Sequence, residues 1–248
     1  MPSERLKNWA LRGLFFCISV HATESFAGRP LITDDAGVVP DKILQLETWI
    51  FADERSGQHW VVPTIGVKDK MEFSASAVQG LPFQGDRDYS LSGPILQSKF
   101  LLHQSRKNHE PSLALSFGGI APYGGGGFKT KEWDYFSYLA FTFHPLTGDK
   151  LFIHLNIGQQ SRRSQNSNGQ ALLWGVAAEF KWDEKTYLFT EGANGDTYAL
   201  LPGMALQVGF RHQYDEKLQL DGTIGRGVSG DPLLPVWVTL GIRYLFEI

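Results

Sequence analysis

In many stretches of this chain, every second residue is apolar or aromatic. The segment 151–158, LFIHLNIG, has Leu or Ile at each odd position, and the closing segment 236–246, VWVTLGIRYLF, has an apolar or aromatic residue at each even position. A period of two places successive side chains on opposite faces of an extended chain, so each stretch is predicted to be a β-strand with one apolar face. The chain is therefore expected to be all-β.

Twelve such stretches can be traced through the sequence. Strands of about 9–11 residues are long enough to cross a bilayer at a tilt. The predicted strands are Lys42–Ala52, His59–Lys68, Met71–Gly80, Pro94–His103, Ser112–Ala121, Glu132–His144, Leu151–Gln160, Ala171–Trp182, Thr186–Gly192, Gly203–Tyr214, Leu218–Gly225 and Val236–Phe246.

The connections between these strands alternate in length. The shorter ones are charged turns at 68–70, 183–185 and 215–217, with slightly longer ones at 145–149 and 105–110. The longer ones are loops at 81–93, 122–131, 161–170, 193–202 and 226–235, after a modest first loop at 53–58. Short turns on one rim and longer loops on the other are typical of outer-membrane barrels. The pattern predicts an antiparallel up-and-down transmembrane β-barrel of about 12 strands.

A soluble β-sandwich or lipocalin-like barrel is the main alternative, because its strands also alternate. Such a protein would turn its apolar parity towards a core, and composition alone does not separate the two arrangements. The closing strand favours the membrane, since its alternating apolar and aromatic residues from Leu240 to Phe246 resemble the signal that the barrel assembly machinery reads. No apolar run of about 18 residues is present, so membrane-spanning helices are not expected.

The N-terminal segment has the features of an export signal. Basic residues precede a short apolar stretch at 14–20, and Ser25-Phe26-Ala27 fits a cleavage site with small residues. A lipoprotein anchor at Cys17, the only cysteine, is disfavoured because Phe15 and Phe16 stand where small residues are wanted. We predict a signal peptide at 1–27, a periplasmic lead at 28–41 and a barrel at 42–248. The barrel would lie in the outer membrane of a Gram-negative bacterium, among lipid and lipopolysaccharide.

Nine charged residues share the parity opposite the predicted lipid face. They are Glu47, Glu72, Lys99, Glu179, Lys181, Glu191, Arg211, Asp221 and Arg243. A charge costs a few kcal/mol on the lipid side of a barrel strand, so these residues are expected to face the lumen. Two interpretations stay open, a polar path or binding site for a small solute and a network of paired charges that fills a closed barrel.

The lead before the first strand is predicted to be a plug. Pro30 and Pro40 prevent it from extending the sheet. Asp34 and Asp35 are expected to find partners among the basic lumen residues Lys99, Lys181, Arg211 and Arg243. These pairs would hold the lead in or across the periplasmic mouth of the barrel.

Most aromatic residues fall near predicted strand ends, where the interfacial girdles of membrane barrels lie. The set is Trp49, Trp60, Trp133, Tyr135, Tyr138, Trp174, Trp182, Tyr187, Tyr214, Trp237 and Tyr244. Trp49, Phe51 and Trp237 also share the inner parity, so contact with an aromatic ligand in the lumen is a second interpretation for them.

Signs of enzyme chemistry, metal binding or cofactor binding are weak. The histidines, including His144 and His154, are scattered without a G-x-S-x-G motif. The adjacent Asp34 and Asp35 lack further metal ligands at fixed spacing, and the glycine run 124–127 is not followed by the Lys-Ser/Thr of a phosphate loop. The net charge of −3 does not suggest nucleic-acid binding. No catalytic residue, metal or cofactor is predicted.

The segment RPLITDD at 29–35, followed by LQLE at 44–47, resembles the start of the MetA-pathway phenol-degradation family. Later segments share its rhythm, among them TIGV at 64–67, MEF at 71–73, QVGFR at 207–211 and LQLD at 218–221. The resemblance extends over nearly the whole chain after residue 28. It implies an outer-membrane barrel connected with the uptake or export of compounds from aromatic breakdown.

These observations favour a channel or transporter for small aromatic or hydrophobic solutes. The alternative is a closed structural or interaction barrel that acts through its external loops, where the basic loop 161–169 would contact lipopolysaccharide headgroups. An outer-membrane lipid hydrolase that uses His144 or His154 is the least favoured function.

Overall fold

The structure is a computed structural model of the whole chain. It describes residues 29–83, 88–105, 110–130, 132–146, 150–164, 167–195, 203–230 and 233–248. The predicted signal peptide at 1–27 lies outside these residues. None of the helical residues in these ranges forms a segment long and apolar enough to span a membrane.

The described residues form thirteen strands, of which β4 has only two residues. The strands are β1 Ile43–Ala52, β2 Ser56–Val67, β3 Met71–Pro82, β4 Ser90–Leu91, β5 Ile95–His103, β6 Ser112–Ile120, β7 Asp134–Phe143, β8 Leu151–Ser164, β9 Ser167–Lys181, β10 Thr186–Asn194, β11 Met204–Gln213, β12 Leu218–Gly227 and β13 Val236–Glu247. A single 3₁₀ turn, η1 at Gly126–Phe128, lies among the described residues between β6 and β7.

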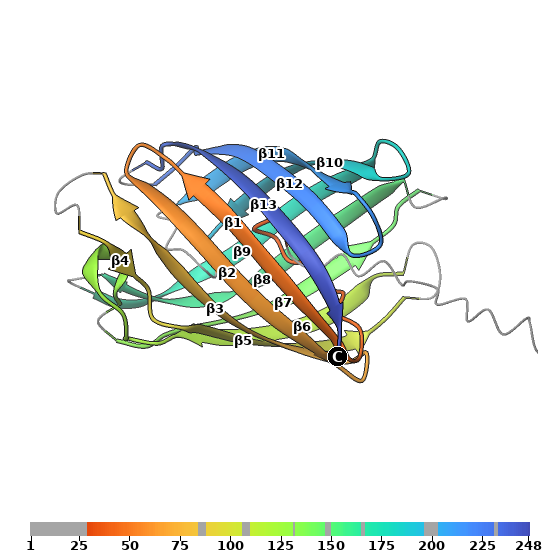
Figure 1. Ribbon diagram of the computed structural model, residues 1–248, viewed down its shortest axis with the longest axis horizontal. Coiled ribbons are helices and arrows are strands. Elements are labelled where there is room, and N and C mark those ends of the chain that lie inside the picture. The colour runs from red at the N-terminus through yellow and green to blue at the C-terminus, as the bar shows by residue number, and fades with distance from the viewer. Residues whose placement is uncertain are drawn as a thin grey trace, which may run out of the picture.

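The long strands close into one antiparallel barrel (Figure 1). Each pairs with its neighbours in sequence, β1 pairs with β13 and β2 pairs with β3, so the sheet has no free long edge. We call the rim with the turns 68–70, 183–185 and 215–217 the turn end, and the opposite rim the loop end. The C-terminus lies at the turn end, where the Ile248 amide donates to the Lys42 carbonyl oxygen.

Each of the twelve predicted strands is present, with bounds that differ by a few residues. The loop predicted at 161–170 is wrong, because β8 and β9 continue through it and remain paired as far as Ser164 and Ser167. Its polar sequence lacks the apolar alternation that marked the other strands. Strand β4 and η1 were not predicted, and they lie together at the loop end, where Leu91 forms a bridge with Gly125.

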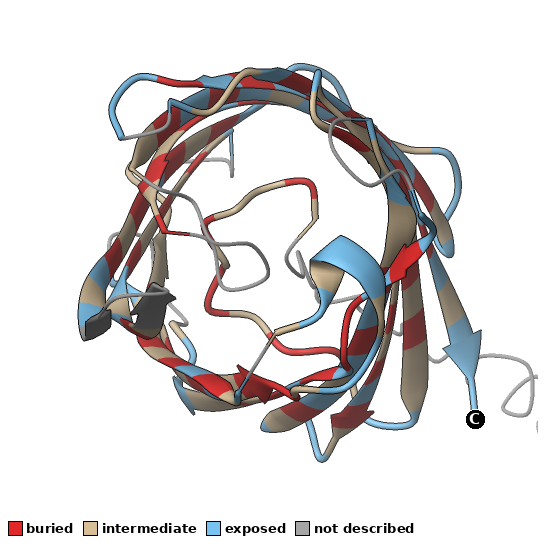
Figure 2. Ribbon diagram, turned by 90° about the vertical axis from the view of Figure 1, so that its left-hand side faces the viewer, coloured by how far each residue is buried: buried red, intermediate tan, exposed pale blue. Residues whose placement is uncertain are grey.

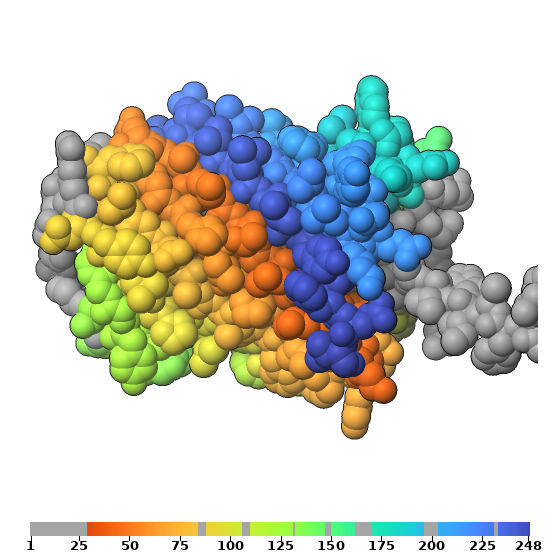
Figure 3. All heavy atoms as spheres, in the orientation of Figure 1, coloured from red at the N-terminus to blue at the C-terminus, as the bar shows by residue number. Residues whose placement is uncertain are grey.

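The outward face of the barrel wall is apolar and the inward face is polar, as a membrane protein requires. Outward-facing Ile50, Val208 and Leu240 are 59%, 51% and 68% exposed, whereas the inward face holds buried polar and charged residues. Side chains of β1, β2, β3 and β13 cover one side of this outer surface without a visible opening (Figure 3). A soluble barrel would bury its apolar parity, so this arrangement selects the transmembrane barrel over the lipocalin-like alternative.

Residues 29–41 lie inside the barrel rather than beside it. Viewed from the loop end, this segment crosses the space enclosed by the ring of strands, and η1 turns inward at the near rim (Figure 2). We call residues 29–41 the lead. Its last residues meet the turn end, where Lys68 donates its backbone N–H to Asp41 and Asp41 donates its own to Asp69.

Candidate lumen site

The nine charged residues predicted to face the lumen all lie on strands, and eight of them are buried. The buried residues are Glu47, Glu72, Lys99, Glu179, Glu191, Arg211, Asp221 and Arg243. Lys181, the last residue of β9, is half-buried. Eight different strands therefore contribute charge to one interior.

The lead is bound to the wall through its own backbone. The backbone N–H groups of Ile32 and Thr33 donate to Glu191, that of Asp34 to Asn156, that of Ala36 to Thr142 and that of Val39 to Glu72. The Asn156 amide also donates to the Asp34 carbonyl oxygen, at 2.8 Å. These partners lie on four different strands, β10, β8, β7 and β3. A buried N–H needs a partner, and the side chains of the wall supply it where a strand neighbour is missing.

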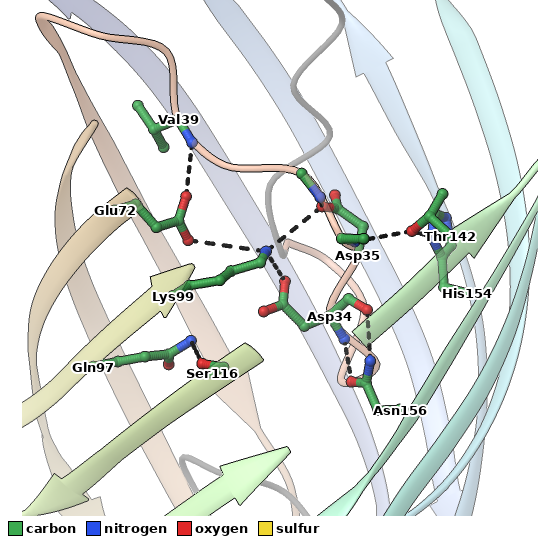
Figure 4. A network of polar contacts seen from close by, with 12 residues as sticks. Asp34, Asp35, Val39, Glu72, Gln97, Lys99, Ser116, Thr142, His154 and Asn156 are labelled. Carbon is green, nitrogen blue, oxygen red and sulfur yellow. Dashed lines mark hydrogen bonds and ion pairs between the residues drawn. The ribbon is translucent and has the colours of Figure 1, made fainter. Parts of the chain in front are cut away.

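One ammonium group gathers three carboxylates at the centre of this contact (Figure 4). Lys99 Nζ lies 2.8 Å from Asp34 Oδ1, 3.6 Å from Asp35 Oδ1 and 3.9 Å from Glu72 Oε1. The Lys99 side chain is 0% exposed, and the Tyr138 hydroxyl donates to the second oxygen of Asp34 at 2.7 Å. Because a buried charge is costly without a partner, Lys99 and the lead depend on each other.

Four basic residues were predicted to pair with Asp34 and Asp35, and in the structure Lys99 is the one that forms ion pairs with them among the described residues. Arg211 pairs with Glu179 and Arg243 donates to Gln213, while Lys181 lies 5.5 Å from the centroid of a neighbouring tyrosine ring. Acidic residues of the wall compete for the arginines, and only the three-dimensional arrangement decides this competition.

Two glycines of the wall give the lead its space. A Cβ at Gly66 would lie 2.0 Å from the Pro40 carbonyl oxygen, and a Cβ at Gly175 would lie 2.2 Å from Thr33 Oγ1. The contact at Gly66 is with backbone, so a side chain there and the docked lead exclude each other, whereas at Gly175 the Thr33 hydroxyl would have to rotate away. The wall is thus shaped for this segment.

The loop-end half of the lumen contains stacked aromatic rings. Trp49 and Trp60 stack at 5.1 Å between ring centroids, and Phe51 stacks with Trp237 at 6.3 Å. The assignment of Trp60, Tyr138 and Tyr187 to an interfacial girdle is wrong, because all three are buried on the inner face. Each of these residues occupies an inward-facing position of its strand, whereas the prediction considered only how close it lies to a strand end.

Sequence reasoning missed the neutral residues that hold the lead. Asn156, Thr142 and Tyr138 all lie on the inner parity of β7 or β8, which was the one signal that could have identified them. Thr142 also meets His154 Nδ1 at 2.9 Å, and His154 lies 3.8 Å from Glu179. The threonine hydroxyl also accepts the Ala36 N–H, so it takes part in holding the lead.

No group of three or more His, Cys, Asp or Glu side chains in the described part of the chain is arranged to hold a metal ion.

Comparison with known proteins places the chain in a sequence family and a fold. A family model described as "Uncharacterised conserved protein UCP029691" matches residues 16–246. No curated protein matches the sequence.

Several solved outer-membrane barrels share the fold. The COG4313 outer membrane channel from Pseudomonas putida F1 is 12% identical, with a TM-score of 0.64 over 86% of this chain and 98% of that chain. The KdgM porin is 9% identical, with a TM-score of 0.59 over 82% of this chain and 99% of that chain. The NanC porin is 8% identical, with a TM-score of 0.56 over 81% of this chain and 98% of that chain. At these identities the similarity establishes the fold.

Proposed function

The chain belongs to the family described as uncharacterised conserved protein UCP029691, and we propose that it is an outer-membrane channel for small solutes that the lead holds closed. One observation carries the proposal. Glu191, Asn156, Thr142 and Glu72 of the wall hold the backbone of a segment that crosses the lumen and belongs to no strand. A barrel that needed only to be filled could use inward side chains of its own strands.

The solutes that we propose are small and aromatic or hydrophobic. Support comes from the inward-facing Trp49, Trp60 and Trp237, whose buried rings would offer apolar surface to a solute once the lead has withdrawn. The resemblance to the MetA-pathway phenol-degradation family is consistent with this class of solute. Aromatic rings bind other rings by offset or edge-on stacking, which adds to the gain from apolar burial.

The proposal includes the cellular setting predicted from the sequence. Residues 1–27 direct export and are removed, the turn end faces the periplasm and the loop end faces outward. The partners are outer-membrane lipid and lipopolysaccharide, together with the assembly machinery during biogenesis. The chain acts without a cofactor and catalyses no reaction.

A permanently closed barrel that works through its external loops is the second candidate. The observation that favours it is the complete burial of Lys99 and Glu179, which have no contact with water while the lead is docked. In that case the lead would be a structural core, and its removal would damage the barrel rather than open it.

The experiment compares the full chain with a variant that lacks residues 29–40 behind the intact signal peptide. Both proteins are purified from outer membranes, checked for heat-modifiable mobility as a sign of a folded barrel, and inserted in planar bilayers. We expect a higher conductance for the variant. We also expect a larger gain in uptake for phenol than for glycerol when liposomes with the variant are compared with protein-free liposomes, because phenol also crosses lipid unaided. A folded variant with unchanged conductance would contradict the channel, and equal gains for the two solutes would contradict the proposed preference.

A further inference from the structure

Arg29, the first described residue of the lead, places its guanidinium group against the barrel wall. Its Cζ lies 4.1 Å from the ring centroid of Trp49, and its Nη2 lies 3.0 Å from Asp221 Oδ1 and 3.3 Å from Thr239 Oγ1. The side chain is 12% exposed, so it is largely withdrawn from water. An aromatic face combined with a charge-assisted hydrogen bond is an effective way to bind an organic cation.

The wall residues around this group form a recess. Trp49, Gly241 and Asp221 stand in register across β1, β13 and β12, with the glycine in the middle. A Cβ at Gly241 would lie 2.7 Å from Asp221 Oδ1 and 3.0 Å from Arg29 Nη2. The missing side chain therefore leaves a space between ring and carboxylate that any other residue would fill.

The recess also has acceptors that Arg29 does not use. Glu47, two positions before Trp49 on the same face, has a buried Oε1 with no hydrogen-bond partner among the described residues, and Asp221 Oδ2 is in the same state. Arg29 itself leaves its Nε without a partner in this part of the chain. A cation that is not tethered to the lead can reorient to use more of these acceptors.

Charge balance points to the same class of ligand. Two acidic residues, Glu47 and Asp221, lie near Arg29, and each has an arginine beside it on the next strand. Arg243 is the register partner of Glu47, and Arg211 is the register partner of Asp221. Arg211 is already committed to Glu179, and Arg243 donates to Gln213. When Arg29 leaves, the recess loses the cation that lies closest to Asp221.

We propose that Trp49, Asp221, Thr239, Gly241 and Glu47 form a lumen binding site for guanidinium-type organic cations, which Arg29 occupies as a built-in ligand. The proposal goes beyond the proposed aromatic or hydrophobic solutes and rests on the proposed closure by the lead, because a solute enters this recess from the lumen when the lead has withdrawn. A solute that carries such a cation would compete with Arg29 and favour the undocked lead.

The test uses ethylguanidinium chloride as the probe and isothermal titration calorimetry on detergent-solubilised, folded barrels. We expect saturable binding to the Arg29→Ala variant, and binding about tenfold weaker or more in the Arg29→Ala/Asp221→Asn double variant, because a hydrogen bond to a charged group is lost. The full-length protein with Arg29 should bind as weakly as the double variant. Arg55→Ala, which removes an arginine from the loop-end rim, is the matched control and should also bind weakly.

Folded Arg29→Ala protein that binds ethylguanidinium no better than the double variant would overturn the site. Equal binding by Arg55→Ala and Arg29→Ala would overturn it too, because the effect would then be independent of the recess. Calorimetry does not require conduction, so the two proposals can fail separately. A barrel that stays silent without its lead, yet binds the probe when Arg29 is removed, would refute the channel and support the site.

Discussion

The turn-end and loop-end halves of the lumen share one wall but differ in the contacts that stand out in each. In the turn-end half, charged residues from many strands surround the lead, and Lys99 alone meets three carboxylates. In the loop-end half, the lumen is lined by stacked rings such as Trp49 and Trp60. The outward face is apolar in both halves because lipid requires it. The interior is free of that constraint, so the difference between the halves reflects what each must hold.

Substitutions in the two halves should therefore have different effects on the lead and on stability. Charges in the turn-end half are stabilised by groups of the lead, so damage there should release the lead. Rings in the loop-end half contact one another and also Arg29 of the lead, which lies on Trp49, so a conservative change there should lower stability slightly while Lys99 keeps the lead docked.

The largest effect is expected from Lys99→Met. The substitution leaves Asp34, Asp35 and Glu72 buried without their shared cation, and the loss of one partner from a buried ion pair costs about 3–5 kcal/mol. We expect a lower free energy of unfolding in phospholipid vesicles and faster amide hydrogen exchange in residues 29–41. Lys70→Met, at an exposed turn, is the matched control. Unchanged exchange in the lead would show that Lys99 does not hold it.

Gly66→Ala should have the next largest effect. The added methyl group would lie 2.0 Å from the Pro40 carbonyl oxygen and 2.1 Å from that of Val39, so the lead must shift. Overpacking of this kind costs about 1–3 kcal/mol. We expect raised conductance in planar bilayers. Gly192→Ala, whose Cβ would come no nearer than 3.2 Å to a flexible leucine side chain, should leave the conductance as it is. Equal currents from both variants would mean that the contact with the lead is irrelevant.

Trp60→Phe tests the loop-end half and should have the smallest effect. The variant weakens the stacking on Trp49 and removes the indole N–H that donates to Gln58, with an expected loss of about 1 kcal/mol. Guanidine unfolding should detect this loss, while amide exchange in the lead stays unchanged. Trp182→Phe, at a 67% exposed position, is the matched control. Release of the lead by Trp60→Phe would erase the distinction between the halves.

The barrel could be predicted from the sequence because its signal is local. A period of two is visible in each strand by itself, and lipid contact keeps the outward parity apolar. The end of the β8–β9 hairpin escaped prediction for the same reason, since its polar residues from 161 to 170 carry no apolar alternation.

The contents of the lumen were predictable only in part. The nine inward charges could be selected by parity, because few other places in a membrane barrel accept a charge. Which charge meets which could not be predicted, since Lys99, Arg211 and Arg243 look equivalent in sequence and differ only in the wall residues beside them. Asn156 and Thr142 carry no charge, so nothing in the sequence separated them from other polar residues on the inner face.

A disulfide that ties the lead to the wall gives the most direct test of closure. The Ala36 backbone nitrogen lies 2.9 Å from Thr142 Oγ1, so the two positions are neighbours, and a cysteine is introduced at each to form the cross-link. The chain's one cysteine, Cys17, belongs to the predicted signal peptide and would not compete. The pair is introduced into the Lys99→Met background, where the lead is expected to be released, and cross-linking is verified by mass spectrometry.

Single-channel current is then measured in planar bilayers before and after addition of a reductant. A lead that closes the lumen predicts little current from the oxidised protein and a large, reversible increase on reduction. High current from protein whose cross-link is verified would contradict closure by the lead.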